Sequence, residues 1–302
     1  MLKTNRIKRI ALRAFAKINL TLEVLGERPD GYHELRTVMH SIGLFDTVTV
    51  TVEPFSGPDR YIRVRANEPL PFRNTARRAA EAYFAAADRL CPESVCGLAV
   101  SIDLEKGIPS EAGLGGASAD GAAVLFALEK LIGALGTEKL YEIAPSIGAD
   151  VPFCLHGGCA LCEGIGERLT DCPAAELPLL IVKGERGVST GALFRALPPA
   201  TEKAGAPSAD MLEALRSGDA EAVSGLLMND LGSAAEQVAP EIAEYRARLL
   251  EAGAVGALMS GSGSSVYGIF RSLEAAEAAL RAFPDLPFRA VSITKDGPFE
   301  EV

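Results

Sequence analysis

The most informative stretch of this 302-residue chain is GIPSEAGLGGASAD, residues 107–120. An alternating strand at 98–104 leads into it, and an apolar helix that ends near Ile132 follows it. Glycines at 113, 115 and 116 let the backbone approach an anion closely and take positive φ angles. The amide groups and the dipole at the start of the helix favour a phosphate group there. The stretch therefore predicts a phosphate-binding loop or, with equal weight, a flexible turn into a helix.

This loop departs from three better-known motifs. It contains no G-x-x-x-x-G-K-[ST] sequence, so it is not a Walker A site. It lacks the third glycine of the dinucleotide-binding G-x-G-x-x-G motif. Asp120 stands where the G-x-S-x-G elbow of serine hydrolases requires glycine. A second glycine and serine loop, 260–265, lies between two predicted strands, and it either presents backbone amides to another anionic group or is a plain hairpin loop.

Upstream of the loop, residues 13–24 alternate between apolar and polar side chains. This pattern predicts a half-buried strand with Lys17 and Asn19 about 7 Å apart on its polar face. Further strands are predicted at 47–52, 61–64, 98–104, 179–182, 254–259, 266–270 and 289–293, with a strand or hairpin at 152–162. Helices are predicted at 74–90, 137–147, 190–196, 209–216, 219–231 and 240–252, with another begun by Ser272, and a surface loop at 198–208. After residue 164, strands and helices interleave as in α+β or α/β proteins.

Composition narrows the class of protein. The chain is 48% hydrophobic and 23% charged, which is typical of a globular protein with sizeable cores. Its formal net charge of -10 disfavours non-specific binding to nucleic acid or to an anionic membrane. No apolar run approaches the roughly 18 residues of a membrane span, and we find no signal peptide. We therefore expect a cytoplasmic protein without nucleic-acid or membrane partners.

The six cysteines are too few for a disulfide scaffold. Cys154, Cys159 and Cys162 have the spacing of three ligands of a plant-type iron–sulfur cluster, with His156 and Cys172 nearby. In the predicted strand, however, Cys159 and Cys162 would point to opposite faces. Their neighbours are apolar, and a buried free cysteine behaves as a small hydrophobic side chain. We therefore favour buried thiols over a metal site.

Several motifs carry a resemblance to a known family. The segment 109–123 resembles the phosphate loop of the GHMP kinase superfamily, named after galacto-, homoserine, mevalonate and phosphomevalonate kinases. AKINL at 16–20 and GERPDGYHEL at 26–35 resemble the branch that acts on a cytidine diphosphate conjugate of methylerythritol. GADVPF at 148–153 and MSGSGSSVYGIF at 259–270 match the same branch. The chain departs from the family pattern at Phe15, Ala117 and Ala119, where the family has proline, glycine and serine.

The resemblance implies a two-domain α+β fold of the GHMP kinase type. The N-terminal ATP-binding half, residues 1–163, would be a ribosomal-S5-domain-2-like unit, and the C-terminal half, residues 164–302, would be ferredoxin-like. In the cleft between them, ATP with Mg²⁺ would phosphorylate the 2-hydroxyl of the small-molecule cytidine compound, in the non-mevalonate (methylerythritol phosphate) route to isoprenoid precursors. The protein would be a monomer or a homodimer. Two alternatives stay open: a sister kinase for another small alcohol, and a non-catalytic nucleotide-binding protein.

The resemblance also implies roles for individual residues. Asp150 would accept the proton of the hydroxyl group, although an aspartate at such a junction is otherwise typical of a turn or a helix cap. Lys17 would lie near Asp150 and the transferring phosphate, and would polarise the hydroxyl. Tyr32 would stack on cytosine, His33 would hydrogen-bond to its edge, and Phe194 would cover its other side. The residues expected to bind substrate are Asn19, Tyr32, His33, Thr190 and Phe194.

For ATP, the resemblance implies contacts along the glycine-rich loop and with two residues outside it. Asn74 and Lys106 would contact the adenine site, and Asn74 is equally suited to cap the helix that follows it. Ser118 would contact a phosphate group or Mg²⁺. The expected loop contacts are Pro109, Ser110, Glu111, Ala112, Gly113, Leu114, Gly115, Gly116, Ala117, Ser118 and Ala119.

Overall fold

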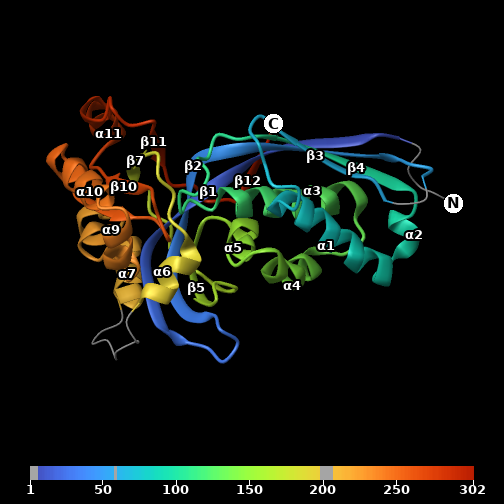
Figure 1. Ribbon diagram of the computed structural model, residues 1–302, viewed down its shortest axis with the longest axis horizontal. Coiled ribbons are helices and arrows are strands. Elements are labelled where there is room, and N and C mark those ends of the chain that lie inside the picture. Colours follow the sequence, from blue (N-terminus) through green and yellow to red (C-terminus); the bar gives the residue numbers. More distant parts are fainter. Residues whose placement is uncertain (1–5, 58–59, 198–206) are drawn as a thin grey trace.

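The computed structural model describes residues 6–57, 60–197 and 207–302, and its strands form two sheets in two lobes (Figure 1). The first sheet is built around a long hairpin of β1 (Lys8–Glu27) and β2 (His33–Pro54). The other strands of this sheet are β3 (Ile62–Ala66), β4 (Leu98–Glu105), β5 (Cys159–Gly164), β6 (Arg168–Asp171), β8 (Met228–Asn229) and β12 (Phe299–Glu301). Their order is β12-β1-β2-β4-β3, with β5 beside β2, β6 beside β5 and β8 beside β1.

Helices cover one face of the first sheet (Figure 1). Helix α3 (Gly116–Ile132) is apolar on most sides, and so it can be buried between β1 and β2 on one side and α1 (Thr75–Leu90) on the other. Asn74 caps α1, because its Oδ1 accepts a hydrogen bond from Arg77 N at 2.9 Å. The remaining helices of this lobe are α2 (Pro92–Val95), α4 (Thr137–Ile147) and α5 (Val151–His156).

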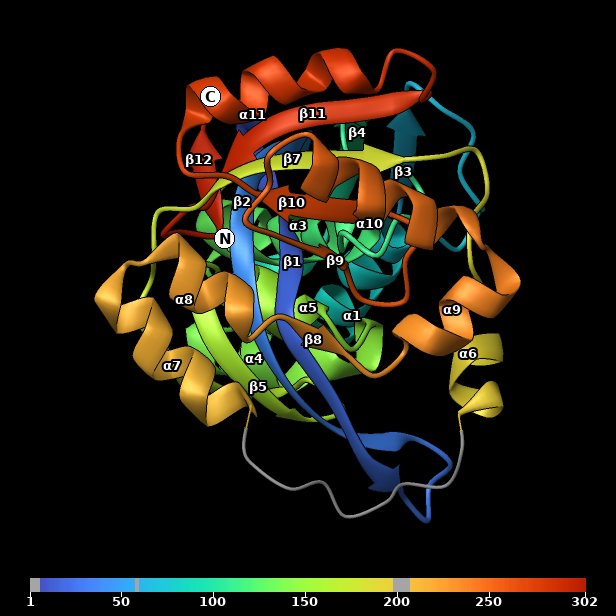
Figure 2. The same ribbon diagram turned by 90° about the vertical axis from the view of Figure 1, so that its left-hand side faces the viewer.

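The second sheet is antiparallel and has the order β11-β7-β10-β9 (Figure 2). Its strands are β7 (Pro178–Lys183), β9 (Gly256–Met259), β10 (Val266–Ile269) and β11 (Phe288–Ile293). Helix α10 (Glu241–Glu251) packs on β9 and β10, and α11 (Leu273–Ala279) packs on β7 and β11. The other helices here are α6 (Thr190–Ala196), α7 (Pro207–Ser217), α8 (Ala220–Gly225) and α9 (Gly232–Val238), with a 3₁₀ turn at Leu280–Ala282. These two lobes of mixed sheet and helix confirm the α+β prediction.

Three predicted elements differ from the structure. The segment 152–162 is not a strand or hairpin: it begins in helix α5, whose first turn carries Pro152, and β5 starts only at Cys159. Two glycines with positive φ, Gly157 and Gly158, separate these elements. The predicted helix at 219–231 is divided into α8 and α9 by the short strand β8. The strand at 289–293 is not the last one, because β12 follows it and pairs with β1.

The strand predicted to be half-buried is buried on both faces, from residue 14 to residue 24. Its apolar face packs beneath α3, as the alternation predicts. Its polar face meets the second lobe, where the hydroxyl of Tyr267 on β10 donates to Asn19 O at 2.8 Å. Farther along, Ser208 of α7 donates from Oγ to the buried carboxylate of Glu23 at 2.5 Å. The polar face of β1 therefore lies between the lobes, which brings Lys17 to the site described below.

Strands β6 and β12, which follow the boundary predicted at residues 163 and 164, belong to the first sheet. β6 pairs with β5 in the first sheet, and β12 returns to β1 from the end of the second half. The division into residues 1–163 and 164–302 stays a prediction. Of the loop predicted at 198–208, residues 198–206 lie outside the described residues. No helix in the described ranges combines the length and apolarity needed to cross a membrane.

Candidate active site

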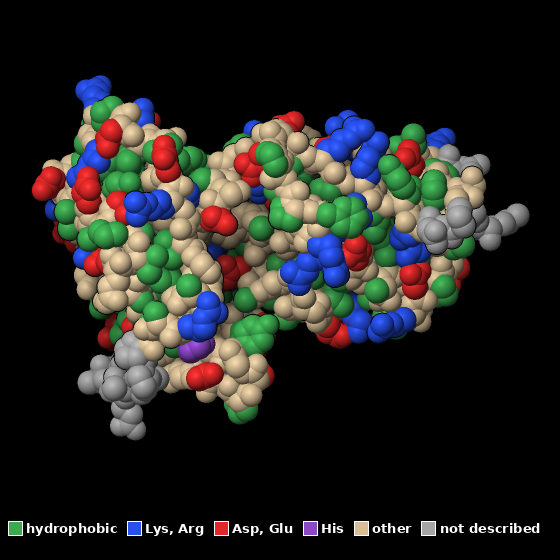
Figure 3. All heavy atoms as spheres, in the orientation of Figure 1, with side chains coloured by type: hydrophobic (Ala, Val, Ile, Leu, Met, Phe, Trp, Pro, Cys, Tyr) green, Lys and Arg blue, Asp and Glu red, His purple; other side chains and the backbone are tan. Residues whose placement is uncertain are grey.

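A cavity of about 890 Å³ opens between the two lobes, where the surface is hollowed (Figure 3). Its walls come from β1, from the loops before α1 and α3, from α6 and from the second glycine loop. The two glycine-rich loops therefore lie at one cavity, as expected if both serve one ligand site. The predicted site residues that line it are Lys17, Asn19, Asn74, Lys106, Pro109, Ser110, Glu111, Ala112, Gly113, Leu114, Gly115, Gly116, Ala117, Ser118, Asp150, Thr190 and Phe194.

The first glycine-rich loop has a shape that requires glycine at two positions. Gly113 and Gly115 have φ angles of 73° and 72°. A Cβ atom at Gly113 would lie 2.0 Å from the carbonyl oxygen of Ser260, and one at Gly115 would lie 2.9 Å from Cγ of Lys17. The carbonyl oxygen of Leu114 accepts a hydrogen bond from Lys17 N at 2.9 Å. The loop is thus packed directly against β1 and the second loop.

Helix α3 begins where this loop ends, so its first amide groups have no partner within the helix. Gly116, Ala117 and Ser118 line the cavity at this helix end, which is a favourable place for a phosphate group. Ala119 differs from them. Its amide donates to Gly115 O at 2.8 Å, and its side chain is buried in the core, so it is not among the lining residues.

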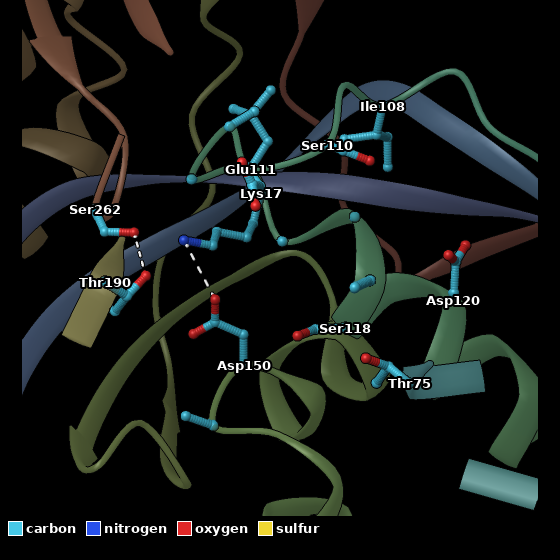
Figure 4. Close-up of a pocket in the computed structure, with 18 of the residues that line it drawn as sticks. Lys17, Thr75, Ile108, Ser110, Glu111, Ser118, Asp120, Asp150, Thr190 and Ser262 are labelled. Atoms are coloured by element: carbon cyan, nitrogen blue, oxygen red, sulfur yellow. Dashed lines mark hydrogen bonds and ion pairs between the residues drawn. The ribbon is translucent and has the colours of Figure 1, made fainter. Parts of the chain in front are cut away.

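The second loop supports the first. Ser260 donates from Oγ to Gly113 O at 2.9 Å, and a backbone hydrogen bond of 3.1 Å joins the two loops as well. At the other side of the loop, the hydroxyl oxygens of Ser262 and Thr190 lie 2.7 Å apart across the cavity wall (Figure 4). The second loop therefore contacts both the first loop and α6, and stabilises their relative positions.

The two candidate catalytic side chains meet beside the first loop (Figure 4). Nζ of Lys17 lies 3.4 Å from Oδ2 of Asp150 and donates to Oδ1 of Asn19 at 2.7 Å. The Lys17 side chain is 3% exposed, whereas that of Asp150 is 31% exposed. Asp150 occupies the N-cap position of α5, but its side chain makes no capping hydrogen bond. Capping therefore does not explain its orientation, and the carboxylate is free to meet a ligand beside a fixed positive charge.

Thr37, on the neighbouring strand β2, sets the orientation of the Asn19 side chain. The single hydroxyl proton of Thr37 is donated to Thr21 O at 2.5 Å. Oγ1 of Thr37 therefore accepts from Nδ2 of Asn19, 2.8 Å away. This leaves Oδ1 of Asn19 facing the Lys17 ammonium. Asn19 lines the cavity as predicted, but both polar atoms of its side chain are engaged within the protein.

A buried ion-pair cluster lies behind the first loop. Nζ of Lys106 contacts Oδ2 of Asp46 and Oδ2 of Asp120, the latter at 2.6 Å. Oδ1 of Asp46 accepts from the amides of Gly107 and Ile108 at 2.7 and 2.8 Å. Burial raises the pKa of Asp120 to about 8 against the opposing effect of Lys106. Burial lowers the pKa of Lys106, but the charges of Asp120 and Asp46 outweigh it and the pKa is raised.

Of the three residues predicted to recognise cytosine, only Phe194 is among the residues that line the cavity. The ring centroids of His33 and Phe194 are 4.8 Å apart, with 35° between the ring planes. Phe194 lines the cavity, whereas His33 does not. Tyr32 is 59% exposed and is also absent from the lining. The structure thus brings His33 and Phe194 together, whereas the Tyr32 side chain is exposed outside the cavity lining.

The cysteines of the candidate cluster lie on two different elements. Cys154 is on α5, and Cys159 and Cys162 are on β5, all three buried. Burial raises the pKa of the Cys154 thiol. Nε2 of His156 lies 2.9 Å from Oδ1 of Asp171. Across the described ranges, no group of three or more His, Cys, Asp or Glu side chains is arranged to hold a metal ion.

Sequence reasoning missed Thr37, Asp46 and the part played by Asp120. A hairpin around the turn at 29–31 would have placed residues near 37 opposite the polar face of β1. Thr37 was therefore within reach of sequence reasoning. Asp46 gives no such signal, because it follows an irregularity in the β1–β2 pairing and its three partners come from elsewhere in the chain.

Two regions of the chain match kinase families. Residues 74–158 match the GHMP kinases N terminal domain, and residues 211–287 match the GHMP kinases C terminal family. The 4-diphosphocytidyl-2-C-methyl-D-erythritol kinase of Desulfitobacterium hafniense is 42% identical over 271 residues, covering 89% of this chain and 89% of the relative. The kinase of the same name from Pelotomaculum thermopropionicum is 42% identical over 270 residues, covering 88% of this chain and 91% of the relative.

Solved structures agree with these matches. A crystal structure of 4-(cytidine 5'-diphospho)-2C-methyl-D-erythritol kinase has a TM-score of 0.77 and 34% identity, covering 97% of this chain and 100% of its own. A homoserine kinase from Cytophaga hutchinsonii shares the fold, with a TM-score of 0.73 and 19% identity over 100% of this chain and 99% of its own. The two-domain GHMP kinase fold and the resemblance are confirmed. The chain belongs to the 4-diphosphocytidyl-2-C-methyl-D-erythritol kinase family of GHMP kinases.

Proposed function

We propose that this protein transfers the γ-phosphoryl group of ATP to the 2-hydroxyl of 4-diphosphocytidyl-2-C-methyl-D-erythritol, in the methylerythritol phosphate route to isoprenoid precursors. The observation that carries the proposal is the meeting of Lys17 and Asp150, 3.4 Å apart beside the glycine-rich loop. A protein that only binds a nucleotide needs neither side chain in this arrangement. The names of the relatives support the choice of acceptor.

In this reaction the hydroxyl oxygen of the acceptor bonds to the γ-phosphorus, and the bond between that phosphorus and the bridging oxygen of ADP breaks. The hydroxyl proton passes to Asp150, which is exposed enough to reach it. Lys17 attracts the negative charge on the transferring oxygens. Asn19 and Gly115 hold Lys17 in place before the substrates arrive, so little reorganisation is needed during the transfer.

The triphosphate of ATP fits the end of α3, at the amides of Gly116, Ala117 and Ser118. Adenosine would lie toward Asn74, whose neighbours also line the cavity. The half-buried hydroxyl of Ser118 is suited to Mg²⁺, and an ion carried mainly by phosphate oxygens and water needs no carboxylate cluster. When bound, Mg²⁺ would neutralise phosphate charge.

A cytoplasmic location and a monomeric or homodimeric state stay predictions.

A GHMP kinase for another small alcohol is the second candidate. The position of Tyr32 favours it, because the side chain expected to stack on cytosine is 59% exposed and does not line the cavity in this structure. A panel of small alcohols separates the candidates. We expect ADP release with the cytidine compound to exceed that with homoserine or mevalonate by orders of magnitude.

The deciding experiment measures ADP release with the cytidine compound for the native chain and for Asp150→Asn. Loss of a general base is expected to lower kcat by about 10²–10⁴-fold. ATP affinity should be retained. Asp88→Asn is the matched control, because Asp88 also pairs with a cation, Arg60, but lies on the surface of α1. Native ATP binding without turnover of this acceptor would overturn the proposed substrate, and unchanged turnover in Asp150→Asn would overturn the role of Asp150.

A further inference from the structure

We propose that Asp46, acting with Lys106 and Asp120, is a positioning residue that sets the shape of the phosphate loop and thereby the affinity for the nucleotide phosphates. Asp46 is fully buried and does not line the cavity, so it acts without touching the nucleotide. The inference rests on the proposed function in one respect, namely that this loop binds ATP.

The cluster connects the residues before the phosphate loop with the helix that follows it. On the incoming side, Oδ1 of Asp46 accepts from the amides of Gly107 and Ile108, at 2.7 and 2.8 Å. On the outgoing side, Lys106 links Asp46 to Asp120, which lies in the second turn of α3. The carboxylate of Asp46 therefore holds the loop directly at its incoming end, and through Lys106 and Asp120 at its outgoing end. Hydrogen bonds to a charged carboxylate are stronger than neutral ones, so the restraint is stiff.

The start of α3 lies directly over this cluster. A Cβ atom built on Gly116, the first residue of the helix, would be 3.5 Å from Oδ2 of Asp46. A shift of Asp46 would therefore move the amides of the first helical turn. Those amides are the groups suited to the phosphates, and an anion site of this kind depends on their common direction. Adenosine, by contrast, would sit toward Asn74 and depend little on this turn.

The charges of the cluster are compatible with an anionic ligand. Two ionised carboxylates around one ammonium would leave a net negative charge behind the phosphate site. Burial and the neighbouring carboxylate of Asp46 raise the pKa of Asp120, which disfavours a second negative charge in the cluster. Asp120 lies on α3 beyond Ser118 as seen from Asp150 (Figure 4), so it is not placed to accept the substrate proton.

This role for Lys106 differs from a direct contact with adenosine. The Lys106 side chain is 6% exposed, and its ammonium is shared by two carboxylates. If Lys106 serves the loop, its removal should weaken binding of ATP and ADP but leave binding of adenosine unchanged. If it contacts adenosine, all three ligands should bind more weakly.

The test is to measure equilibrium binding of ATP, ADP and adenosine to the native chain, Asp46→Asn and Lys106→Met, with KM for the alcohol as a second readout. Asparagine keeps an acceptor for the two amides but loses the ion pair. We expect ATP and ADP affinities to fall roughly tenfold in both variants, as for the loss of one charge-assisted interaction. Adenosine affinity and KM for the alcohol should stay within twofold of native values.

Glu129→Gln is the matched control. Glu129 also holds a loop by accepting from two amides, those of Leu135 and Gly136, but at the opposite end of α3. The Glu129→Gln variant should have a lower Tm but native ATP affinity. It therefore distinguishes an effect on the phosphate loop from a general loss of stability. The inference is overturned by native ATP affinity in Asp46→Asn, by equal weakening of adenosine, or by equal ATP loss in Glu129→Gln. A native chain that does not bind ATP overturns the proposed function itself and this inference with it.

Discussion

The two ends of the cavity are built in different ways. At the phosphoryl-transfer end, Lys17, Asn19 and Thr37 are buried side chains of two long strands, joined in one chain of hydrogen bonds. At the outer end, His33 and Phe194 come from the tip of a hairpin and from a short helix, and their rings touch each other. One end is fixed before ligands bind, whereas the rings at the other end must rearrange before they can contact a base.

The rearrangement follows from the roles expected for the two rings. His33 is expected to meet the edge of cytosine and Phe194 to cover one of its faces, but here the two rings contact each other, with 4.8 Å between their centroids. Substitutions at the transfer end should therefore change kcat, and substitutions at the outer end should change KM for the alcohol.

The largest effect is expected at the contact between the two glycine-rich loops. In Gly113→Ala, the new Cβ would lie 2.0 Å from Ser260 O at a φ of 73°, so one loop must move. Displacements of about 1 Å cost roughly 10²-fold in rate, and the strained backbone adds to this, so we expect kcat/KM to fall by about 10³-fold.

Gly136→Ala is the control for backbone strain. Gly136 has a φ of 80°, but nothing lies within 4 Å of its Cβ position. It should lose some stability and keep its turnover. Equal loss of turnover in the two variants, measured by ADP release, would show that strain alone matters and that the fixed contact between the loops does not.

Acid should destabilise the scaffold of the transfer end. His40 pairs with Ile18 in the β1–β2 hairpin, and burial lowers its pKa from 6.5 to about 4 despite Asp296 and a bond to Ser41 O. The folded protein favours the neutral imidazole. The contribution of His40 to the free energy of unfolding is therefore complete above pH 6.5 and is lost as the pH falls toward 4. We expect this to remove about 3 kcal/mol of unfolding free energy.

Denaturant unfolding between pH 7 and pH 4 measures this slope. The His40→Asn variant should be less stable at pH 7 but should lose less on acidification, because asparagine does not titrate. A slope identical to that of the native chain would mean that other groups carry the acid response.

A smaller effect is expected from loosening Asn19. Thr37→Val removes the hydroxyl that orients the Asn19 amide, so Lys17 loses its fixed partner. Since one hydrogen bond contributes about 1 kcal/mol, kcat should fall about fivefold to tenfold with KM for both substrates unchanged. Thr37→Ser keeps the hydroxyl and should restore most of kcat. A rise in KM with native kcat would instead assign Thr37 to binding.

The smallest effect is expected at the outer end. Phe194→Leu removes the ring that lies against His33 and would cover the base. Aromatic contacts of this kind contribute about 0.5–1.5 kcal/mol beyond buried area. KM for the cytidine compound should therefore rise roughly threefold to tenfold, with kcat and KM for ATP unchanged. Steady-state kinetics with each substrate varied in turn decides this, and a fall in kcat alone would remove the contrast between the two ends.

The same contrast explains which features could be predicted from the sequence. The strand at 13–24, the glycine-rich loop and α3 follow local patterns, and the structure confirms them. Helix α5 was missed because its six residues are too short for a helical period to appear. Asp46 was missed because its role depends on Lys106, Gly107 and Asp120, which the fold brings to it. Local sequence patterns predict helices and strands. A buried cluster cannot be predicted from them, because its side chains come together only when the helices and strands pack in the fold.

The pairing of β12 with β1 has a consequence for synthesis on the ribosome. Residues 299–301 close onto residues 12–14, so this part of the first sheet stays an open edge while the whole second lobe is made. At about 5–20 residues per second, the edge is exposed for roughly 10 seconds or more after the β1–β2 hairpin has emerged. An open edge can pair with another chain. Nascent chains of this protein are therefore most at risk of association during that interval, and a chaperone that covers strand edges would protect them.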